Sequence, residues 1–399
     1  MISVEDALQR ILAAFSPLES ERVSLDSAYR RVLAEDAHAK FDQPPFPVSS
    51  MDGYAVRAED VAQPPVQLGV IGCALAGHPF QGTVSRGEAV RIFTGAVVPE
   101  GADAIVIQED TNLGEQTVTI KAASRPGRHV RSAGIDFKQG EVLVVSGKRL
   151  NARDLALLAA GDIASVMVRR RPRVLLAATG DELSRPGEPR KPGGIVASSA
   201  FALSALIEKW GGEPSDLGIL PDRVDSIASI ARHAERAGKV DLIVTLGGAS
   251  VGDHDLVQRA LGPKGFVLDF WKIAMRPGKP LIFGRLGKTP LLGLPGNPVS
   301  SYVCALLFLK PAIAAVLGTS TETEIIEMRL APALAANGLR QNYVRARISR
   351  RDGELWAEPF PAQDSSMQKV LAEADGFIVR PPGATAAQRG VRIQVLIAT

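Results

Sequence analysis

Residues 172–183 read PRVLLAATGDEL, an apolar run that ends in a glycine and two acidic residues. A short apolar run closed by such a turn is typical of a buried strand. The pattern then alternates: it predicts helices at 197–212 and 223–238, and strands at 216–222, 240–248 and 289–298. Alternating strands and helices indicate a parallel sheet covered on both faces. We therefore expect an αβα parallel-sheet domain at about 170–318.

The flanking regions have a different pattern. Short apolar or alternating runs separated by glycine or proline fill residues 54–145, and five more follow residue 326. They predict a β-rich barrel or sandwich before the αβα domain and a small β-barrel after it. The N-terminus predicts an amphipathic helix in MISVEDALQRILAAF, then a strand, then a second helix at 24–39.

Composition excludes several classes of protein. The chain has 399 residues, enough for two to four domains, and a net charge of only +3, which argues against a nucleic-acid partner. The two cysteines form no CxxC motif, as expected in a reducing compartment. The acidic residues near the N-terminus argue against a signal peptide. The apolar stretch 302–317, interrupted by Lys310 and Pro311, predicts a buried helix too short to span a bilayer. We expect a cytoplasmic protein with no membrane partner.

Polar motifs follow four of the predicted strands. In an open parallel sheet, ligands bind outside the carboxyl ends of the strands, so these motifs should meet at one edge. They are Thr179-Gly180-Asp181-Glu182, Pro221-Asp222, residues 247–255 (GGASVGDHD) and residues 295–298 (PGNP).

Residues 247–255 form the most informative of these motifs. Glycines let the backbone approach an anion, and free amides at a helix start can hold phosphate. Asp253 and Asp255 beside such a loop favour a divalent cation. The motif is neither a P-loop nor GxGxxG, and a simple strand-to-helix turn is the alternative.

Two further segments could bind ligands. Asn297 and Ser300 stand at the start of a predicted buried helix, where Asn297 could cap the helix, contact a ligand, or do both. Lys272, Arg276 and Lys279 surround a Pro-Gly turn, where gathered cations suit a small tetrahedral dianion, although a solvated basic loop is the alternative.

The β-rich region holds three weaker motifs: Asp52-Gly53, Thr94-Gly95 and Asp136. A hairpin or Asx-type turn is the alternative for Asp52-Gly53, and the other two motifs indicate little by themselves. The histidines show no metal-ligand spacing, and no Gly-x-Ser-x-Gly motif supports serine-hydrolase chemistry.

Taken together, these strings resemble the molybdopterin molybdenumtransferase family, the group of MoeA and the gephyrin E domain. The matching strings stand in family order along nearly the whole chain. They are SSMDGYAV, RIFTGAVVPEGADAIVIQE, AGIDFKQGEVL, ATGDEL, LGGASVGDHD, MRPGKPLIFG and LPGNPVSSYV.

The resemblance implies an α/β multidomain fold and a homodimer. Its expected domains are an elongated N-terminal domain (1–43 with 138–169), an inserted β-rich domain (44–137), an αβα molybdopterin-binding domain (170–318) and a C-terminal β-barrel (319–399). It also implies that molybdate is inserted into adenylylated molybdopterin, with Mg²⁺ and release of AMP. Implied partners are a molybdopterin adenylyltransferase, and molybdoenzyme apo-proteins or their chaperones.

The resemblance also assigns roles to matching residues. It implies a catalytic set that comprises Asp52, Asp136, Glu182, Asp222 and Asp255, of which the last three would bind the metal. It implies a substrate-binding set that comprises Thr94, Gly247, Gly248, Ser250, Gly252, Asn297 and Ser300. Lys272, Arg276 and Lys279 would bind molybdate.

Two positions depart from the family pattern: Arg276 stands where the family usually has lysine, and Ser199 where it often has asparagine. Three other functions remain open. A molybdopterin adenylyltransferase would consume ATP with plain molybdopterin, and a carrier would bind the cofactor without catalysis. A scaffold would need an interaction segment, which the sequence does not show.

Overall fold

The computed structural model describes residues 1–248 and 253–398, with the backbone alone for 253–255. The chain forms two compact units. The first comprises residues 1–21, 30–34 and 168–399, and the second comprises residues 22–29 and 35–167. The first unit contains the αβα domain and the C-terminal barrel.

The αβα domain is built on a six-stranded sheet of order β15-β12-β16-β20-β19-β17. The strands are β12 (Arg173–Thr179), β15 (Glu213–Leu220), β16 (Leu242–Leu246), β17 (Phe266–Trp271), β19 (Ile282–Leu286) and β20 (Thr289–Leu294). The first four in spatial order are parallel, as predicted.

The prediction of a parallel sheet is wrong for β19, which runs antiparallel to both β17 and β20. Leu286 pairs with Thr289, so only Gly287 and Lys288 connect β19 to β20. A two-residue connection permits only an antiparallel hairpin, and Gly287 adopts the positive φ of 60° that such a turn favours.

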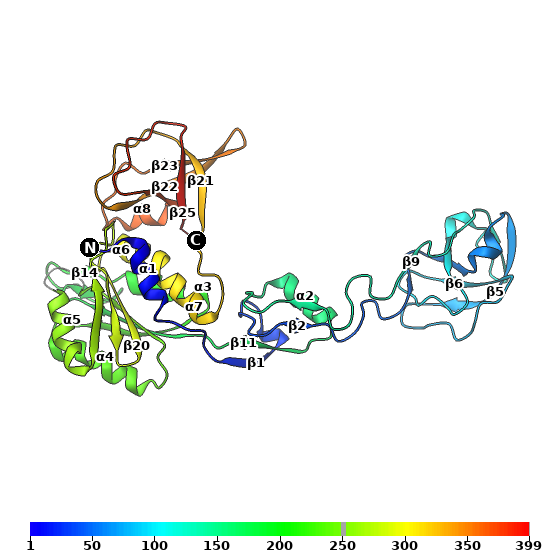
Figure 1. Ribbon diagram of the computed structural model, residues 1–399, viewed down its shortest axis with the longest axis horizontal. Helices are drawn as coiled ribbons and strands as arrows, with labels where there is room; N and C mark the ends of the chain where they lie inside the picture. Colours follow the sequence, from blue (N-terminus) through cyan, green and yellow to red (C-terminus); the bar gives the residue numbers. More distant parts are fainter. Residues whose placement is uncertain (249–252, 399) are drawn as a thin grey trace. The chain divides into compact units, whose positions relative to one another are not determined.

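Helices cover both faces of this sheet (Figure 1). On one face lie α1 (Val4–Leu12), α3 (Ser199–Trp210), α6 (Pro298–Cys304) and α7 (Lys310–Leu317), and on the other α4 (Val224–Arg236) and α5 (Asp253–Leu261). Alternate residues of β12 face the two layers, since Val174 and Leu176 pack with the first set and Leu175 with the second. This two-sided burial explains the continuous apolar run in the sequence.

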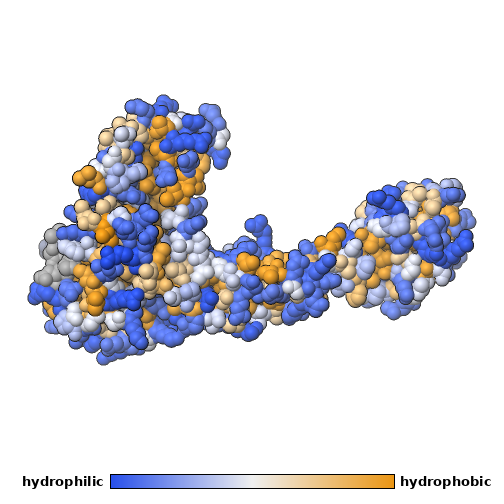
Figure 2. Space-filling view, viewed as in Figure 1, coloured by the Kyte–Doolittle hydropathy of each residue, from blue (hydrophilic) through white to orange (hydrophobic). Residues whose placement is uncertain are grey.

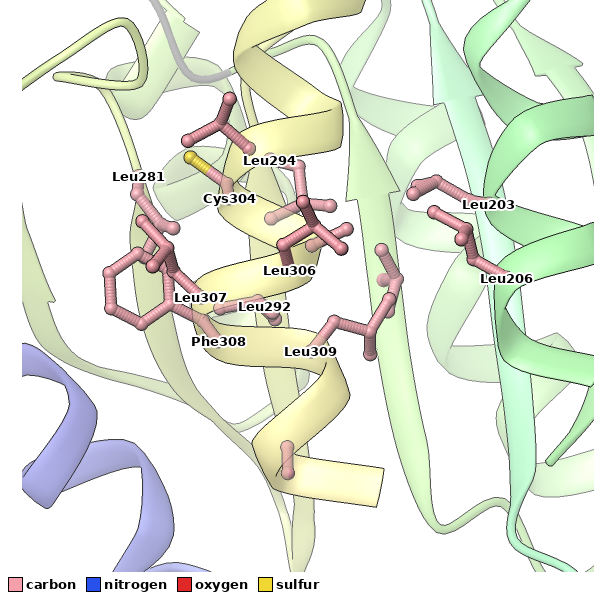
Figure 3. Close-up of a cluster of buried hydrophobic side chains, with 14 of the residues drawn as sticks. Leu203, Leu206, Leu281, Leu292, Leu294, Cys304, Leu306, Leu307, Phe308 and Leu309 are labelled. Atoms are coloured by element: carbon pink, nitrogen blue, oxygen red, sulfur yellow. The ribbon is translucent and has the colours of Figure 1, made fainter. Parts of the chain in front are cut away.

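The buried helix expected at 302–317 is confirmed, but the prediction that it is too short to span a bilayer is wrong. A π-helical turn at Ala305–Leu309 joins α6 to α7, which gives one 20-residue helix, Pro298–Leu317. A π-turn rearranges the backbone hydrogen bonds where proline lacks its N–H, so the helix continues. By length and composition the helix could cross a membrane, but 83% of its most apolar window is buried inside the protein. Figure 3 shows its Leu306 and Phe308 among buried leucines of the sheet and α3.

The C-terminal barrel is confirmed. Its strands β21 (Ile325–Leu330), β22 (Gln341–Arg351), β23 (Glu354–Pro359), β24 (Gly376–Arg380) and β25 (Arg392–Ile397) close through the pairing of β22 with β24. The short strand β18 (Met275–Arg276) extends the barrel, because Met275 pairs with Gln341 and Arg276 with Asn342. This pairing joins the cationic turn of the αβα domain to the barrel, which also carries α8 (Gln368–Ala372).

The second unit is β-rich, as expected. Its main sheet has the order β7-β4-β6-β5-β8. These strands are β4 (Gly53–Val56), β5 (Val66–Ala74), β6 (Glu88–Ile92), β7 (Ala104–Ile107) and β8 (Thr117–Ile120). The unit also holds β2 (Ala37–His38), β3 (Val48–Ser49), β9 (Val130–Arg131), β10 (Val142–Val144) and α2 (Ala152–Ala160).

The helix predicted at 24–39 is wrong. Only a 3-10 turn at Leu25–Ser27 forms, and Arg30, three residues after its end, takes a left-handed φ of 63° that a continuing helix does not allow. Leu33 is buried and bridges to Val168 instead, so tertiary pairing overrides a helical pattern that was uneven.

The remaining short strands are β1 (Ser20–Ser24), β11 (Ser165–Arg169), β13 (Leu183–Ser184) and β14 (Ile195–Val196). On the face seen in Figure 2, apolar residues form small patches among polar ones.

Candidate functional site

A cavity of about 540 Å³ opens at the carboxyl ends of β12, β15, β16 and β20, where the sequence predicted a ligand site. We call it the sheet-edge cavity. Six of the predicted site residues line it: Glu182, Asp222, Gly247, Gly248, Asn297 and Ser300. The sheet topology therefore brings together motifs that lie up to 118 positions apart.

The two glycines after β16 are required by the backbone. Gly247 and Gly248 have φ angles of 87° and 65°, which side chains with a Cβ rarely adopt. A Cβ on Gly247 would also lie 2.5 Å from the carbonyl oxygen of Thr179. The backbone of this wall is therefore exposed to the cavity without side chains in front of it.

Two carboxylates at the cavity come from neighbouring strand ends. Glu182 and Asp222 are both exposed. The loops that carry them are tied together, because the backbone N–H groups of Asp181 and Asp222 each donate to the other residue's carboxylate at 3.4 Å.

These carboxylates fit Mg²⁺ only in part. Within residues 1–248 and 256–398, no three acidic, histidine or cysteine side chains gather closely enough to hold a metal. Mg²⁺ is commonly held by one or two carboxylates, with substrate phosphates and water completing its shell. Glu182 and Asp222 therefore suit a metal that binds together with a phosphorylated substrate.

Three predicted site residues lie wholly or partly outside the described part of the chain. Ser250 and Gly252 lie outside the described residues. Asp255 lies in the first turn of α5, and its side chain is outside the described part of the chain.

The structure does not support the capping role suggested for Asn297. It occupies the N-cap position of α6, but its side chain makes no capping hydrogen bond. Its Nδ2 instead donates to Oγ of Ser365 at 3.0 Å, and the backbone N–H of Val299 donates to the carbonyl oxygen of Ser365. Asn297 thus fastens a barrel segment to the rim of the cavity.

A second cavity of about 520 Å³, the basic cavity, adjoins the first, because Pro280 and Ser300 line both. Five basic side chains and a single acid, Asp364, contribute to its wall. The basic residues are Arg276, Lys279, Arg340, Arg345 and Arg380. This excess of positive charge suits a small multivalent anion.

Sequence reasoning missed Arg345, which is 1% exposed and held by several acceptors. Its Nη2 donates to the carbonyl oxygen of Asp364 at 2.8 Å, and its Nε to the side chain of Gln363 at 3.4 Å. Burial lowers the pKa of its guanidinium, which nevertheless stays charged, as arginine does in proteins. Nothing in the alternating strand YVRARISR distinguished this arginine, since its role depends on the pairing of β18 with β22.

Lys272 lines neither cavity, although the neighbouring backbone N–H of Ile273 donates to the carbonyl oxygen of Lys279 at 2.9 Å. The Nζ of Lys272 is 3.6 Å from the centroid of the Trp271 ring. That ring packs with the core cluster on the α4–α5 face of the sheet.

In the second unit, the structure joins two motifs that were weak separately. Oδ1 of Asp52 accepts hydrogen bonds from both the backbone N–H and the hydroxyl of Thr94, each at 2.8 Å. These bonds, the backbone one first, lower the pKa of Asp52. Asp136 lines a hollow of about 500 Å³ together with Gly95 and Arg131, so the third motif lies at the same end of the unit.

Three family models match the chain in succession. They are the MoeA N-terminal region (domains I and II) at residues 2–161, a probable molybdopterin binding domain at 176–315, and the MoeA C-terminal region (domain IV) at 327–398. A Haemophilus influenzae protein named molybdopterin molybdenumtransferase is 39% identical, covering 95% of this chain and 94% of the relative. A Bacillus subtilis protein of the same name is 36% identical over 99% of this chain and 94% of its own.

The chain belongs to the molybdopterin molybdenumtransferase family. It is accordingly a transferase enzyme of molybdenum cofactor biosynthesis. The fold agrees: a crystal structure of the molybdopterin biosynthesis MoeA protein from Pyrococcus horikosii superposes with a TM-score of 0.87 at 32% identity, covering 100% of this chain and 99% of that chain.

One departure from the family pattern has a structural counterpart in this member. Ser199 opens α3 where the family often has asparagine, and its hydroxyl accepts a hydrogen bond of 3.3 Å from Ser301 of α6. The short side chain is therefore used in the contact between the two helices while it still lines the sheet-edge cavity.

Proposed function

We propose that this enzyme inserts molybdate into adenylylated molybdopterin, with release of AMP and a requirement for Mg²⁺. The observation that carries the proposal is the pair of adjoining cavities that share Ser300 and Pro280. One supplies cations, and the other supplies a glycine loop and two carboxylates. Such a pair can hold a small oxyanion beside a phosphorylated ligand.

The basic cavity would bind MoO₄²⁻ beside the dithiolene sulfurs of the pterin. Arg276 and Lys279 would offer donors from the Pro-Gly turn, and the buried Arg345 would supply a fixed positive charge. These groups favour the dianion electrostatically before and during transfer of the metal. Ser300, at the junction of the cavities, would donate its hydroxyl to either substrate.

The sheet-edge cavity would bind the pterin phosphates. Gly247 and Gly248 would let these phosphates approach the backbone, and Glu182 and Asp222 would hold Mg²⁺ with them. A bound Mg²⁺ supplies charge neutralisation at the phosphoanhydride. AMP would leave when the oxygen of a water molecule bonds to the AMP phosphorus and the bond from that phosphorus to the bridging oxygen breaks. The bridging oxygen stays on the pterin phosphate, the protons of the water pass to the released phosphates and the solvent, and the carboxylates position the water.

We further propose a cytoplasmic homodimer, in which Asp52, Thr94 and Asp136 of one subunit complete the site of the other. Two variants that should each keep only a small residual activity, Asp52→Asn and Asp222→Asn, test this by complementation. Random mixing should restore about a quarter of wild-type activity, because half of the dimers would have one intact site of two. No recovery after verified subunit exchange would contradict a shared site.

The reaction is tested by mixing the protein with adenylylated molybdopterin, Mg²⁺ and molybdate, and following AMP by chromatography. Molybdate-dependent AMP, with active cofactor transferred to an apo-enzyme, would support the transferase reaction. Tight binding of the pterin without AMP release, under conditions where a known transferase works, would favour a carrier. Consumption of ATP with plain molybdopterin would favour an adenylyltransferase.

A further inference from the structure

Arg91, on β6 of the second unit, contacts two aromatic rings. Its guanidinium carbon is 4.9 Å from the ring centroids of both Tyr54 and Phe93. Tyr54 pairs directly with Arg91 across the β4–β6 ladder. Stacking on two rings fixes the plane of the guanidinium, so its donors have defined directions.

Those donors go to residues that flank Asp52. Nη1 donates to the carbonyl oxygen of Gly53 at 3.3 Å, and Nη2 donates to the side chain of Gln108 at 2.7 Å. The backbone N–H of Gln108 in turn donates to the carbonyl oxygen of Asp52 at 3.0 Å. Among the described residues, no carboxylate forms an ion pair with Arg91. Its charge therefore acts on the Asp52-Gly53 turn.

The same strand end holds the Asp52 carboxylate itself. Thr94, three residues after Arg91, donates both its hydrogen bonds to Oδ1 of Asp52. Oδ2 accepts no hydrogen bond from any residue in the described part of the chain. The positive charge of Arg91 also contributes to the lowered pKa of Asp52.

We propose that Arg91 is a positioning residue for Asp52: it fixes the Asp52-Gly53 turn so that Oδ2 is presented, ionised, to the substrate. The inference rests on the proposed function for the identity of that substrate. Arg91 acts through the turn and the electrostatic field, while Thr94 holds the other oxygen.

The kinetic test compares Arg91→Met, Arg91→Lys and the control Arg86→Met, which removes an exposed arginine of the same unit. Arg91→Met should lower kcat about 100-fold, as expected when a reacting group is misplaced, with little change in KM. The acid limb of its pH profile should move to higher pH, because loss of the charge raises the pKa of Asp52. Arg91→Lys should recover part of the rate.

A double-mutant cycle separates positioning from general structure. In an Asp52→Asn background, Arg91→Met should change the rate by less than about twofold, since the group that it positions is gone. An undiminished further loss would overturn the proposal, as would a wild-type rate and pH profile in the Arg91→Met single variant. If Arg91→Met does not fold, Arg91→Lys is used in the same cycle.

A measurement without turnover keeps this proposal distinct from the proposed reaction. The Asp52 carboxyl signal, identified by its absence in Asp52→Asn, can be titrated by ¹³C NMR. Its pKa should rise in Arg91→Met and stay unchanged in Arg86→Met. If the pKa of Asp52 rises in Arg91→Met but the wild type releases no AMP, the proposed reaction is contradicted and the role of Arg91 is not. No rise would contradict the role of Arg91.

Discussion

Asn297 and Ser365 join the walls of the two cavities through one hydrogen bond of 3.0 Å. Asn297 lines the sheet-edge cavity, and Ser365 lines the basic cavity. The bond runs from the start of α6 to the barrel segment that precedes α8, so it holds together part of the wall between the two cavities. A side chain that the sequence suggested as a helix cap thus serves a tertiary contact.

Asn297→Ala should therefore affect binding more than folding. Loss of one exposed hydrogen bond should cost about 0.5–1.5 kcal/mol of unfolding free energy, while KM for both substrates should rise. The matched control is Asn151→Ala, which removes a side chain that does cap its helix, α2. That change should cost about 1 kcal/mol in urea unfolding with KM unchanged. Equal effects of the two variants on KM would contradict a role of Asn297 in the wall between the two cavities.

Gly247→Ala should disrupt the end of β16. The position requires a positive φ, which strains alanine, and the added Cβ would also meet the carbonyl oxygen of Thr179. The free energy of unfolding should therefore fall by more than the roughly 1–3 kcal/mol that backbone strain alone costs. Gly77→Ala is the control, because its φ is also positive, at 80°, but nothing lies within 4 Å of the new Cβ. Urea unfolding measures both variants. A control that is equally destabilised would show that strain, and not the close approach, dominates.

Arg276 and Lys272 should differ in their effect on molybdate. Arg276→Met removes a donor from the basic cavity and should raise KM for molybdate about tenfold, the loss of one charge-assisted hydrogen bond. Lys272→Met, whose parent side chain lies against Trp271, should change KM for molybdate much less. Steady-state AMP release at varied molybdate gives both values. A larger effect for Lys272 would place it nearer the oxyanion than the structure does.

Glu19 should contribute to acid sensitivity. Hydrogen bonds from Lys239, its own backbone and Arg170 lower the pKa of this carboxyl to about 2 from the ordinary 4.5. Since the folded pKa is the lower one, its stabilisation is present above pH 4.5 and is lost as pH falls toward about 2. Glu19→Gln should therefore reduce the drop in urea midpoint between pH 5 and pH 3, relative to the wild type. Glu322→Gln, an exposed control, should leave the drop unchanged.

The arrangement of the fold could be predicted largely from periodicity. Apolar runs closed by glycine predicted β12, β16 and β20, because burial on both faces removes polar residues from a strand. β19 was missed, since Ile282–Leu286 is short and its direction is set by the two-residue turn to β20. The segment 24–39 was wrong because its buried residues bridge to distant partners that local spacing cannot reveal.

The sheet-edge site followed from the sequence because strand order and direction force the loops after β12, β15, β16 and β20 to one edge. The sequence alone predicts Glu182, Asp222, Gly247 and Asn297 at this edge. Only the tertiary structure decided that Arg276 and Lys279 line the basic cavity without Lys272, and that Arg345 joins them. Those positions depend on the pairing of β18 with β22 and on packing against Trp271, contacts between residues far apart in the chain that no local pattern encodes.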